Sequence, residues 1–305
     1  MHHHHENGEA RGKRLLITTV INFSFAVIEC LGGFFSNSLS LISDSLHNLG
    51  DAFSAFLAFF ANKIGERKSD VDKTFGYKRA EILVALLNSL ALIAICIFLF
   101  VEAYERLLNP KPVKGVLMFV VALAGLLANL FSMLLLRRNS SDNLNLKAAY
   151  LHLLGDTFSS VLVIIGGIAI TFWGIYWIDP LITFIVGIFL LKESYKVLKE
   201  AVEILMQAAP CELDLNDLKK EIELIPEISN IHHIHAWRLN DSQSYLECHI
   251  DLKDDLKVSE SQQVKEKVDG ILRKKFKLQH ITVQFEVNSC PDKSMINHIV
   301  PSKNQ

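Results

Sequence analysis

Six long apolar runs fill the first two thirds of the chain, and they restrict its fold more than any other feature. A run of roughly 20 mostly apolar residues can cross a bilayer as a helix, which pairs its backbone polar groups internally. We therefore predict an α-helical membrane protein with six transmembrane helices. The first run is not a signal peptide, because no A-x-A-like cleavage site follows it. The runs lie near Leu15–Gly33, Leu39–Ala61, Ile82–Val101, Gly115–Leu136, Ala148–Ile170 and Ile175–Leu191.

The charge distribution divides the chain into a membrane part and a soluble part. Charged residues become frequent from about residue 210 onward, and such a shift indicates a second domain. We predict a His-rich tail over 1–13, the six-span domain over 14–205, a soluble domain over 206–290 and a disordered tail over 291–305. The histidines His2–His5 fit either a native tail that captures zinc weakly or an expression tag.

Composition excludes some classes of function. A net charge of -2 gives no support for a nucleic-acid partner. The five cysteines are scattered and include no C-x-x-C pair, so they indicate neither a disulfide framework nor a thiolate zinc knuckle.

The distribution of Lys and Arg between the loops predicts the orientation, because cytoplasmic loops carry an excess of these residues. The N-terminal tail holds three of them, loop 62–81 six and loop 137–147 three. The start of the segment after the last run holds three more. The loops on the other side hold only Arg106, Lys111 and Lys114. Both termini are therefore predicted to be cytoplasmic, in a multi-pass protein of the cell membrane.

One octapeptide pattern occurs twice inside the apolar runs, as "HNLGDAFS" at 47–54 and "HLLGDTFS" at 152–159. Helix residues four apart lie on one face, so His47 and Asp51 share a face, as do His152 and Asp156. The two copies fall in the second and fifth runs, which cross in opposite directions, as in the inverted repeats of transporters. His47 should then lie level with Asp156, and Asp51 with His152.

Two such faces together present two imidazoles and two carboxylates, which suit a tetrahedral zinc ion. The absence of further oxygen ligands argues against magnesium and calcium. The alternative interpretation is a pair of polar contacts between helices. Two identical pairs of ionisable groups in lipid favour a metal or proton role, because such groups are costly there and usually functional.

The soluble part has the pattern helix, strand, strand, helix, strand, which predicts an α/β sandwich. The expected elements cover 215–225, 229–239, 244–252, 258–276 and 280–287. Side chains alternate between the two faces of a strand, so His249, His280, Glu286 and one or more of the histidines in 232–235 share a polar sheet face. This face is either a second zinc site or a solvated surface.

Five stretches resemble the cation diffusion facilitator (CDF) family, and within it the bacterial zinc exporters of the CzcD type. They are "SNSLSLISDSLHNLGDAFS", "FGYKRAEILVALLN", "AYLHLLGDTFSS", "WIDPL" and "NIHHIHAWRL", and the resemblance covers about 12–290. It implies a six-span domain with a ferredoxin-like (αββαβ) cytoplasmic domain that binds metal and dimerises. It also implies a bacterial homodimer that exchanges cytoplasmic divalent metal for protons.

The resemblance also implies roles for particular residues. The transport-site metal ligands would be His47, Asp51, His152 and Asp156, with His47 favouring zinc as the substrate and cadmium or cobalt as further candidates. The cytoplasmic metal ligands, for zinc as a regulatory ion, would be His232, His249, His280 and Glu286.

Two further questions stay open at this stage. Arg79 and Glu81 fit either a gate or interface salt bridge or a solvated cluster at the membrane edge. Besides a zinc/proton antiporter, the chain could be a membrane zinc sensor or an intramembrane metallohydrolase. The last is disfavoured because no HExxH motif is present and a catalytic zinc usually keeps an open position.

Overall fold

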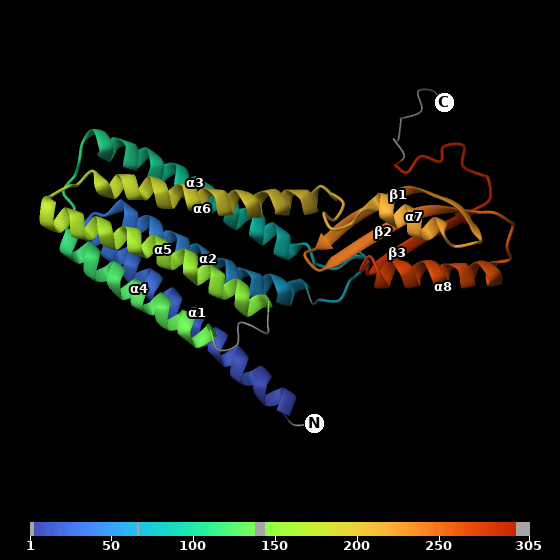
Figure 1. The fold of residues 1–305 in the computed structure, drawn as a ribbon, viewed down its shortest axis with the longest axis horizontal. Helices are drawn as coiled ribbons and strands as arrows, with labels where there is room; N and C mark the ends of the chain where they lie inside the picture. Colours follow the sequence, from blue (N-terminus) through green and yellow to red (C-terminus); the bar gives the residue numbers. More distant parts are fainter. Residues whose placement is uncertain (1–2, 66, 138–143, 297–305) are drawn as a thin grey trace. The chain divides into compact units, whose positions relative to one another are not determined.

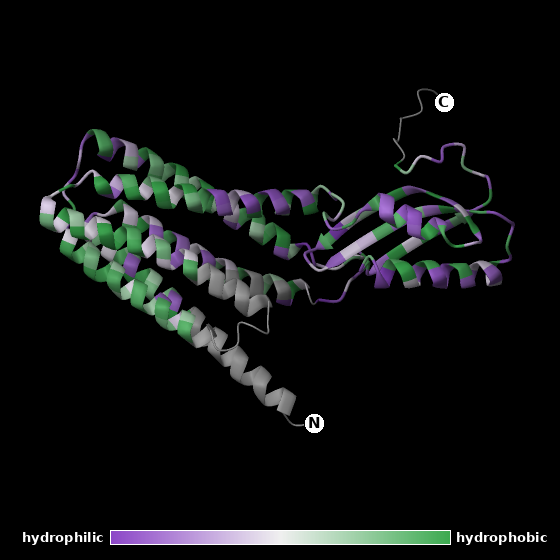
Figure 2. Ribbon diagram, in the orientation of Figure 1, coloured by the Kyte–Doolittle hydropathy of each residue, from purple (hydrophilic) through white to green (hydrophobic). Residues whose placement is uncertain are grey.

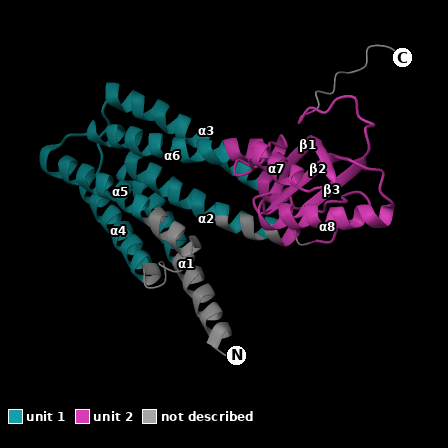
Figure 3. Ribbon diagram, turned by 45° about the vertical axis from the view of Figure 1, so that its right-hand side comes forward, with its two compact units in different colours: residues 1–61, 84–198 teal, residues 62–83, 199–305 magenta. Residues whose placement is uncertain are grey.

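The computed structural model describes residues 3–65, 67–137 and 144–296, apart from the side chains of residues 3–19, 55, 58, 59, 62 and 135–153. The described chain divides into two compact units, one formed by residues up to 61 together with 84–198, and the other by 62–83 together with the residues from 199 onward (Figure 3). The first unit is built from long helices (Figure 1). These are α1 (His3–Ser36), α2 (Leu39–Gly65), α3 (Ala80–Leu108), α4 (Gly115–Arg137), α5 (Leu144–Trp173) and α6 (Ile178–Leu205).

The helical unit presents apolar residues outward, as a lipid environment requires. Phe98, Leu87 and Phe172 are all more than half exposed, and green, hydrophobic positions line the helices along much of their length (Figure 2). Among the described residues, three stretches are long and apolar enough to cross a membrane: Ala80–Leu108, Gly115–Leu134 and Leu154–Trp173. The structure therefore has a helical membrane domain, and the count of six spans stays a prediction.

Helices α4 and α5 pack with their backbones in close contact. A Cβ atom on Gly167 of α5 would lie 3.0 Å from the backbone nitrogen of Phe119 on α4, and one on Gly115 would lie 2.9 Å from the carbonyl oxygen of Gly167. Contacts this short are rare for real Cβ atoms, so a larger residue would force the helices to shift. Small residues permit this kind of approach between membrane helices, so the two glycines fix α4 against α5.

The start of α2 is held by a carboxylate from α6. Asp179 is fully buried. Its Oδ1 accepts hydrogen bonds from the hydroxyls of Ser38 and Ser40 (both 2.6 Å) and from the Ser40 N–H (3.2 Å). Its Oδ2 accepts one from the Leu39 N–H (2.8 Å). The first N–H groups of a helix have no partner within the helix, so Asp179 supplies the cap that α2 needs.

The turn before α2 is fixed from α3. Asn37 has a positive φ of 59°, a backbone conformation that asparagine tolerates better than most residues. Arg106 donates to the Asn37 carbonyl (2.6 Å) and to its side-chain oxygen (3.0 Å). Both ends of this turn are thereby tied to neighbouring helices.

The second unit contains the predicted αββαβ domain. Its elements are α7 (Leu215–Glu223), β1 (Ile228–Asn240), β2 (Gln243–Leu252), α8 (Val258–Lys274) and β3 (His280–Glu286). The sheet order is β1-β2-β3, with β1 antiparallel and β3 parallel to β2. The core lies between one sheet face and the two helices, and its fully buried members include Leu218, Ile222, Val268, Leu272, Ile231, Leu246 and Ile250.

Two other segments pack in this unit. In segment 62–83, Lys78 Nζ donates to Gln243 Oε1 (2.7 Å), and the ring of Phe75 packs edge-on against Tyr245. After β3, the carbonyls of Ser294 and Met295 accept hydrogen bonds from the N–H groups of His233 and Ile234. These hydrogen bonds hold Ser294 and Met295 against β1. The disordered tail over 291–305 stays a prediction, and residues 297–305 lie outside the described part of the chain.

Candidate metal centres

The repeated octapeptides bring α2 and α5 together through ionisable side chains. His47 Nε2 lies 3.4 Å from Asp156 Oδ1, and His47 Nδ1 lies 3.5 Å from Asp51 Oδ2. His47 and Asp156 are buried, whereas the Asp51 side chain is about 37% exposed. One imidazole thus lies between two carboxylates, with His47 level with Asp156 as antiparallel helices require.

The fourth residue of the repeat, His152, belongs to α5, but its side chain lies outside the described part of the structure. On a helix, His152 precedes Asp156 by four positions and shares its face. The described site therefore comprises one ring and two carboxylates, and the part of His152 in it stays a prediction.

Buried polar contacts surround this cluster. Asp44 of α2 accepts hydrogen bonds from the hydroxyls of Ser159 and Ser160 on α5, and Glu29 of α1 accepts one from Asn48 of α2 (3.2 Å). Asp44 and Glu29 are both almost completely inaccessible to solvent. Buried polar groups normally need such partners, so these contacts orient α2 against α5 and α1.

A pocket of about 260 Å³ extends to His47. Gly155 and Ser159 of α5 and Val186 and Lys192 of α6 are among its lining residues. Most of the lining is apolar, so the pocket offers few ligands for a cation besides His47.

A second cluster lies on the sheet of the C-terminal unit. His232 and His249 face each other in the pairing of β1 with β2, and Glu286 ends β3. The Glu286 carboxylate bridges the two rings, because Oε1 lies 2.8 Å from His232 Nε2 and Oε2 lies 3.5 Å from His249 Nδ1. These three residues place ligand atoms within 4.8 Å of one another, a spacing suitable for a metal ion.

The hydrogen bonds of Asn230 orient the ring of His232. The Asn230 amide donates from Nδ2 to Glu223 Oε1 (3.0 Å), so its oxygen faces His232. That oxygen lies 3.1 Å from His232 Nδ1. His232 Nε2 then points toward Glu286, whose Oε1 lies 2.8 Å away. Metal-binding histidines are oriented by this kind of second hydrogen bond.

The structure does not bring His280 to this cluster. His280 pairs with Tyr245 at one end of the parallel strands, whereas Glu286 pairs with Asp251 at the other end. Six residues of strand span roughly 20 Å, and the His280 ring packs against Tyr245 instead. Alternation predicted the correct face but not the position along it, so His280 is removed from the predicted ligand set.

His233 joins the cluster although strand alternation would direct it away from His232. The pairing of β1 with β2 shifts register between 232 and 235, and His233 has a positive φ of 47°. Its ring centroid lies 5.0 Å from that of His232 and 4.9 Å from that of His249. Burial and then the two neighbouring histidines lower the pKa of His233, which favours the neutral, metal-binding form.

Comparison with known protein families identifies the chain. The cation efflux transmembrane domain matches residues 15–206, and the cytoplasmic domain of cation efflux proteins matches 210–288. The chain belongs to the cation efflux (CDF) family.

Several curated members of the cation efflux family are similar over nearly their whole length. A "Cadmium, cobalt and zinc/H(+)-K(+) antiporter" of Bacillus subtilis is 38% identical, covering 95% of this chain and 93% of the relative. The "Metal cation efflux system protein CzcD" of Cupriavidus metallidurans is 35% identical, covering 97% and 93%. The "Zinc transporter ZitB" of Escherichia coli is 34% identical, covering 93% and 90%. These relatives are named as transporters, not enzymes.

In this cation efflux protein, Arg79 and Glu81 flank the start of α3, within the segment that packs on the β1–β2 hairpin. Glu81 is an acidic residue in the first turn of that helix. The neighbouring Lys78 makes the hydrogen bond to Gln243 described above. A gate or interface role for Arg79 and Glu81 stays a prediction.

Proposed function

We propose that this cation efflux protein is a zinc/proton antiporter that exports zinc from the cytoplasm, with cadmium and cobalt as further candidate substrates. The observation that carries the proposal is the position of His47 between Asp51 and Asp156, at distances of 3.5 and 3.4 Å. One nitrogen and two carboxylate groups that converge in an apolar surrounding suit a divalent cation. His152, on the same face of α5 as Asp156, would complete a tetrahedral set.

Proton coupling follows from the ligand chemistry. A bound divalent ion needs neutral imidazoles and ionised carboxylates, so protons compete with zinc for the same atoms. Zinc affinity should therefore fall as the pH drops, and an acidic outer side would promote release of the ion there.

The membrane arrangement forms a second part of the proposal. We propose that all six helices cross the membrane, with both termini in the cytoplasm, over a membrane domain of 14–205 and a cytoplasmic domain of 206–290. The excess of Lys and Arg on one side supports this orientation. The match to the dimeric cytoplasmic domain of the family supports a homodimer.

The third part concerns the cytoplasmic cluster. We propose that His232, His249 and Glu286 bind a regulatory zinc ion. Three buried ligand atoms converge there: His232 Nε2, His249 Nδ1 and Glu286 Oε1. A cation between them would be coordinated by two imidazoles and a carboxylate.

The test is zinc transport by reconstituted vesicles that contain a pH-sensitive dye. Asp51→Ala and Asp156→Ala should each abolish zinc flux, because either change removes a ligand and negative charge in a site of low dielectric constant. Glu105→Gln is the matched control, since this carboxylate is exposed on α3, away from the cluster. Full zinc flux in Asp51→Ala would refute the transport site, and zinc flux that ignores an imposed pH gradient would refute antiport.

A further inference from the structure

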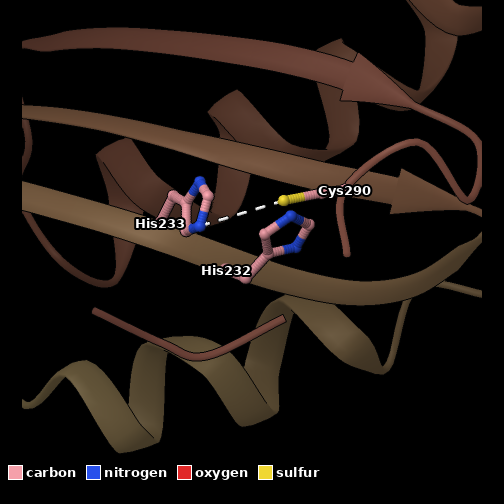
Figure 4. A group of neighbouring side chains, drawn as sticks. All are labelled: His232, His233 and Cys290. Atoms are coloured by element: carbon pink, nitrogen blue, oxygen red, sulfur yellow. Dashed lines mark hydrogen bonds between the residues drawn. The ribbon is translucent and has the colours of Figure 1, made fainter. Parts of the chain in front are cut away.

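A sulfur atom lies beside the cytoplasmic cluster. Cys290, in the segment after β3, has its Sγ 3.9 Å from His233 Nε2 (Figure 4). The ligand atoms of His232, His233 and Cys290 all lie within 4.8 Å of one another. None of these atoms belongs to the transport cluster on α2 and α5, so the group forms a separate constellation of two imidazoles and a thiol.

The backbone of β1 creates this constellation. In a regular strand, His232 and His233 would point to opposite faces. The positive φ of His233 and the irregular pairing that follows His232 place both rings near each other. A positive φ in a non-glycine residue is unfavourable and tends to occur at functional sites.

The segment that carries Cys290 is held against the same irregularity. The His233 and Ile234 N–H groups donate to the carbonyls of Ser294 and Met295 at 3.2 and 2.8 Å. The Cys290 thiol donates to the carbonyl of Asp292 (3.1 Å). The sulfur is therefore positioned by hydrogen bonds on both sides of the cluster.

The imidazole of His232 is buried and held in place. It is fully inaccessible to solvent, and its Nδ1 atom lies 3.1 Å from Asn230 Oδ1. Its Nε2 atom lies 2.8 Å from the Glu286 carboxylate. A cation bound there would therefore meet a ring that is already oriented.

We propose that His232, His233 and Cys290 form a thiolate-containing site for a soft divalent ion, zinc or cadmium. Binding replaces the thiol proton: the S–H bond breaks, the proton leaves to solvent, and a sulfur–metal bond forms. Thiolate ligands favour soft ions over magnesium, calcium and manganese. Because His232 belongs to both triads, an ion bound at Cys290 competes with one bound by His249 and Glu286.

The proposal goes beyond the proposed transport function and can be tested without transport. Cadmium is titrated into the purified full-length protein in detergent, and the ultraviolet charge-transfer absorption of a cadmium–thiolate bond is recorded. The transport ligands contain no sulfur, so this signal reports a cysteine thiolate and not the transport site, and the Cys290→Ser variant assigns it. We expect the signal in the unsubstituted protein and its loss in Cys290→Ser, with cadmium binding there weakened by at least about tenfold, the usual effect of disturbing a metal site.

Three variants make the test specific. Cys211→Ser is the matched control, since Cys211 is exposed in the same unit, and it should keep the signal. His233→Ala should keep the thiol but weaken the cadmium dependence of the signal. The double variant His249→Ala with Glu286→Gln should keep the signal, since it removes only the other triad. A signal that survives in Cys290→Ser, or that is absent from the unsubstituted protein at saturating cadmium, would overturn the proposal.

Discussion

The cap on α2 leads to a quantitative prediction. Asp179→Asn keeps the volume of the side chain and one acceptor oxygen. If that oxygen replaces Oδ1, it retains three of the four hydrogen bonds, from Ser38 and from the side chain and backbone of Ser40. The amide nitrogen then faces the Leu39 N–H, which loses its acceptor.

The expected loss of stability follows from these contacts. A buried donor without a partner costs about 1–3 kcal/mol, and the lost negative charge at the start of a helix costs roughly 0.3–1 kcal/mol more. We therefore expect Asp179→Asn to lower the free energy of unfolding by about 2–3 kcal/mol. Asp179→Ala removes all four hydrogen bonds and should cost more, about 4 kcal/mol or above, in the range of exceptional substitutions.

The assay is equilibrium unfolding of the purified protein in mixed micelles with increasing SDS. Glu105→Gln is the control for loss of an exposed carboxylate. Ser38→Ala, alone and combined with Asp179→Asn, completes a double-mutant cycle, and the combined loss should be smaller than the sum because the two residues share a hydrogen bond. A change below about 0.5 kcal/mol in Asp179→Asn, which is typical of surface substitutions, would refute the capping role.

Three other predictions address helix packing, the orientation of His232 and metal selectivity. Gly167→Ala should destabilise the protein in the same unfolding assay, because its Cβ would meet the Phe119 backbone at 3.0 Å. Gly155→Ala is the control and should be tolerated, since the nearest atom to its Cβ would lie at 3.8 Å. Equal stability of the two variants would contradict close packing of α4 on α5. Asn230→Ala should weaken zinc binding by the cytoplasmic site roughly 10- to 100-fold through loss of the His232 orientation, as calorimetry on the full-length protein can measure, and unchanged affinity would remove Asn230 from the site. His47→Asp should retain transport but relax the preference for zinc and cadmium over manganese, whereas loss of all transport with unchanged folding would show that a carboxylate cannot replace the imidazole at this position.

The sequence predicted the elements and the pairing of the repeated motifs because both follow from local periodicity. The αββαβ order came from short patterns, and the meeting of His47 with Asp156 came from antiparallel helices. The contacts of Asp179 could not be predicted in this way. The carboxylate accepts a hydrogen bond from the Leu39 N–H, which lies 140 positions away in the sequence. No local pattern links the two.

The cytoplasmic cluster shows what the alternation of side chains along a strand can predict and what it cannot. Alternation placed His249, Glu286 and His280 on one sheet face. The position of a residue along the sheet depends on strand pairing, which places His280 at the end away from Glu286. The irregularity at His233 reverses the direction of one side chain, so Cys290 and His233 could not be recognised as neighbours. A run of two histidines after an asparagine, "NIHH", was the only local signal.

The two faces of α5 differ in how easily they can separate. Toward α4, Gly167 packs directly against the backbone of Phe119. Separating these helices would leave voids that no polar group could fill. Toward α2, its contact is made by the hydroxyls of Ser159 and Ser160, which donate to Asp44. The Asp156 carboxylate, which lies beside His47, completes this contact. Polar groups of this kind can exchange one another for water or an ion at small cost. The polar interface between α2 and α5 thus includes the proposed metal ligands. A movement that separated these two helices would also separate His47 and Asp51 from Asp156.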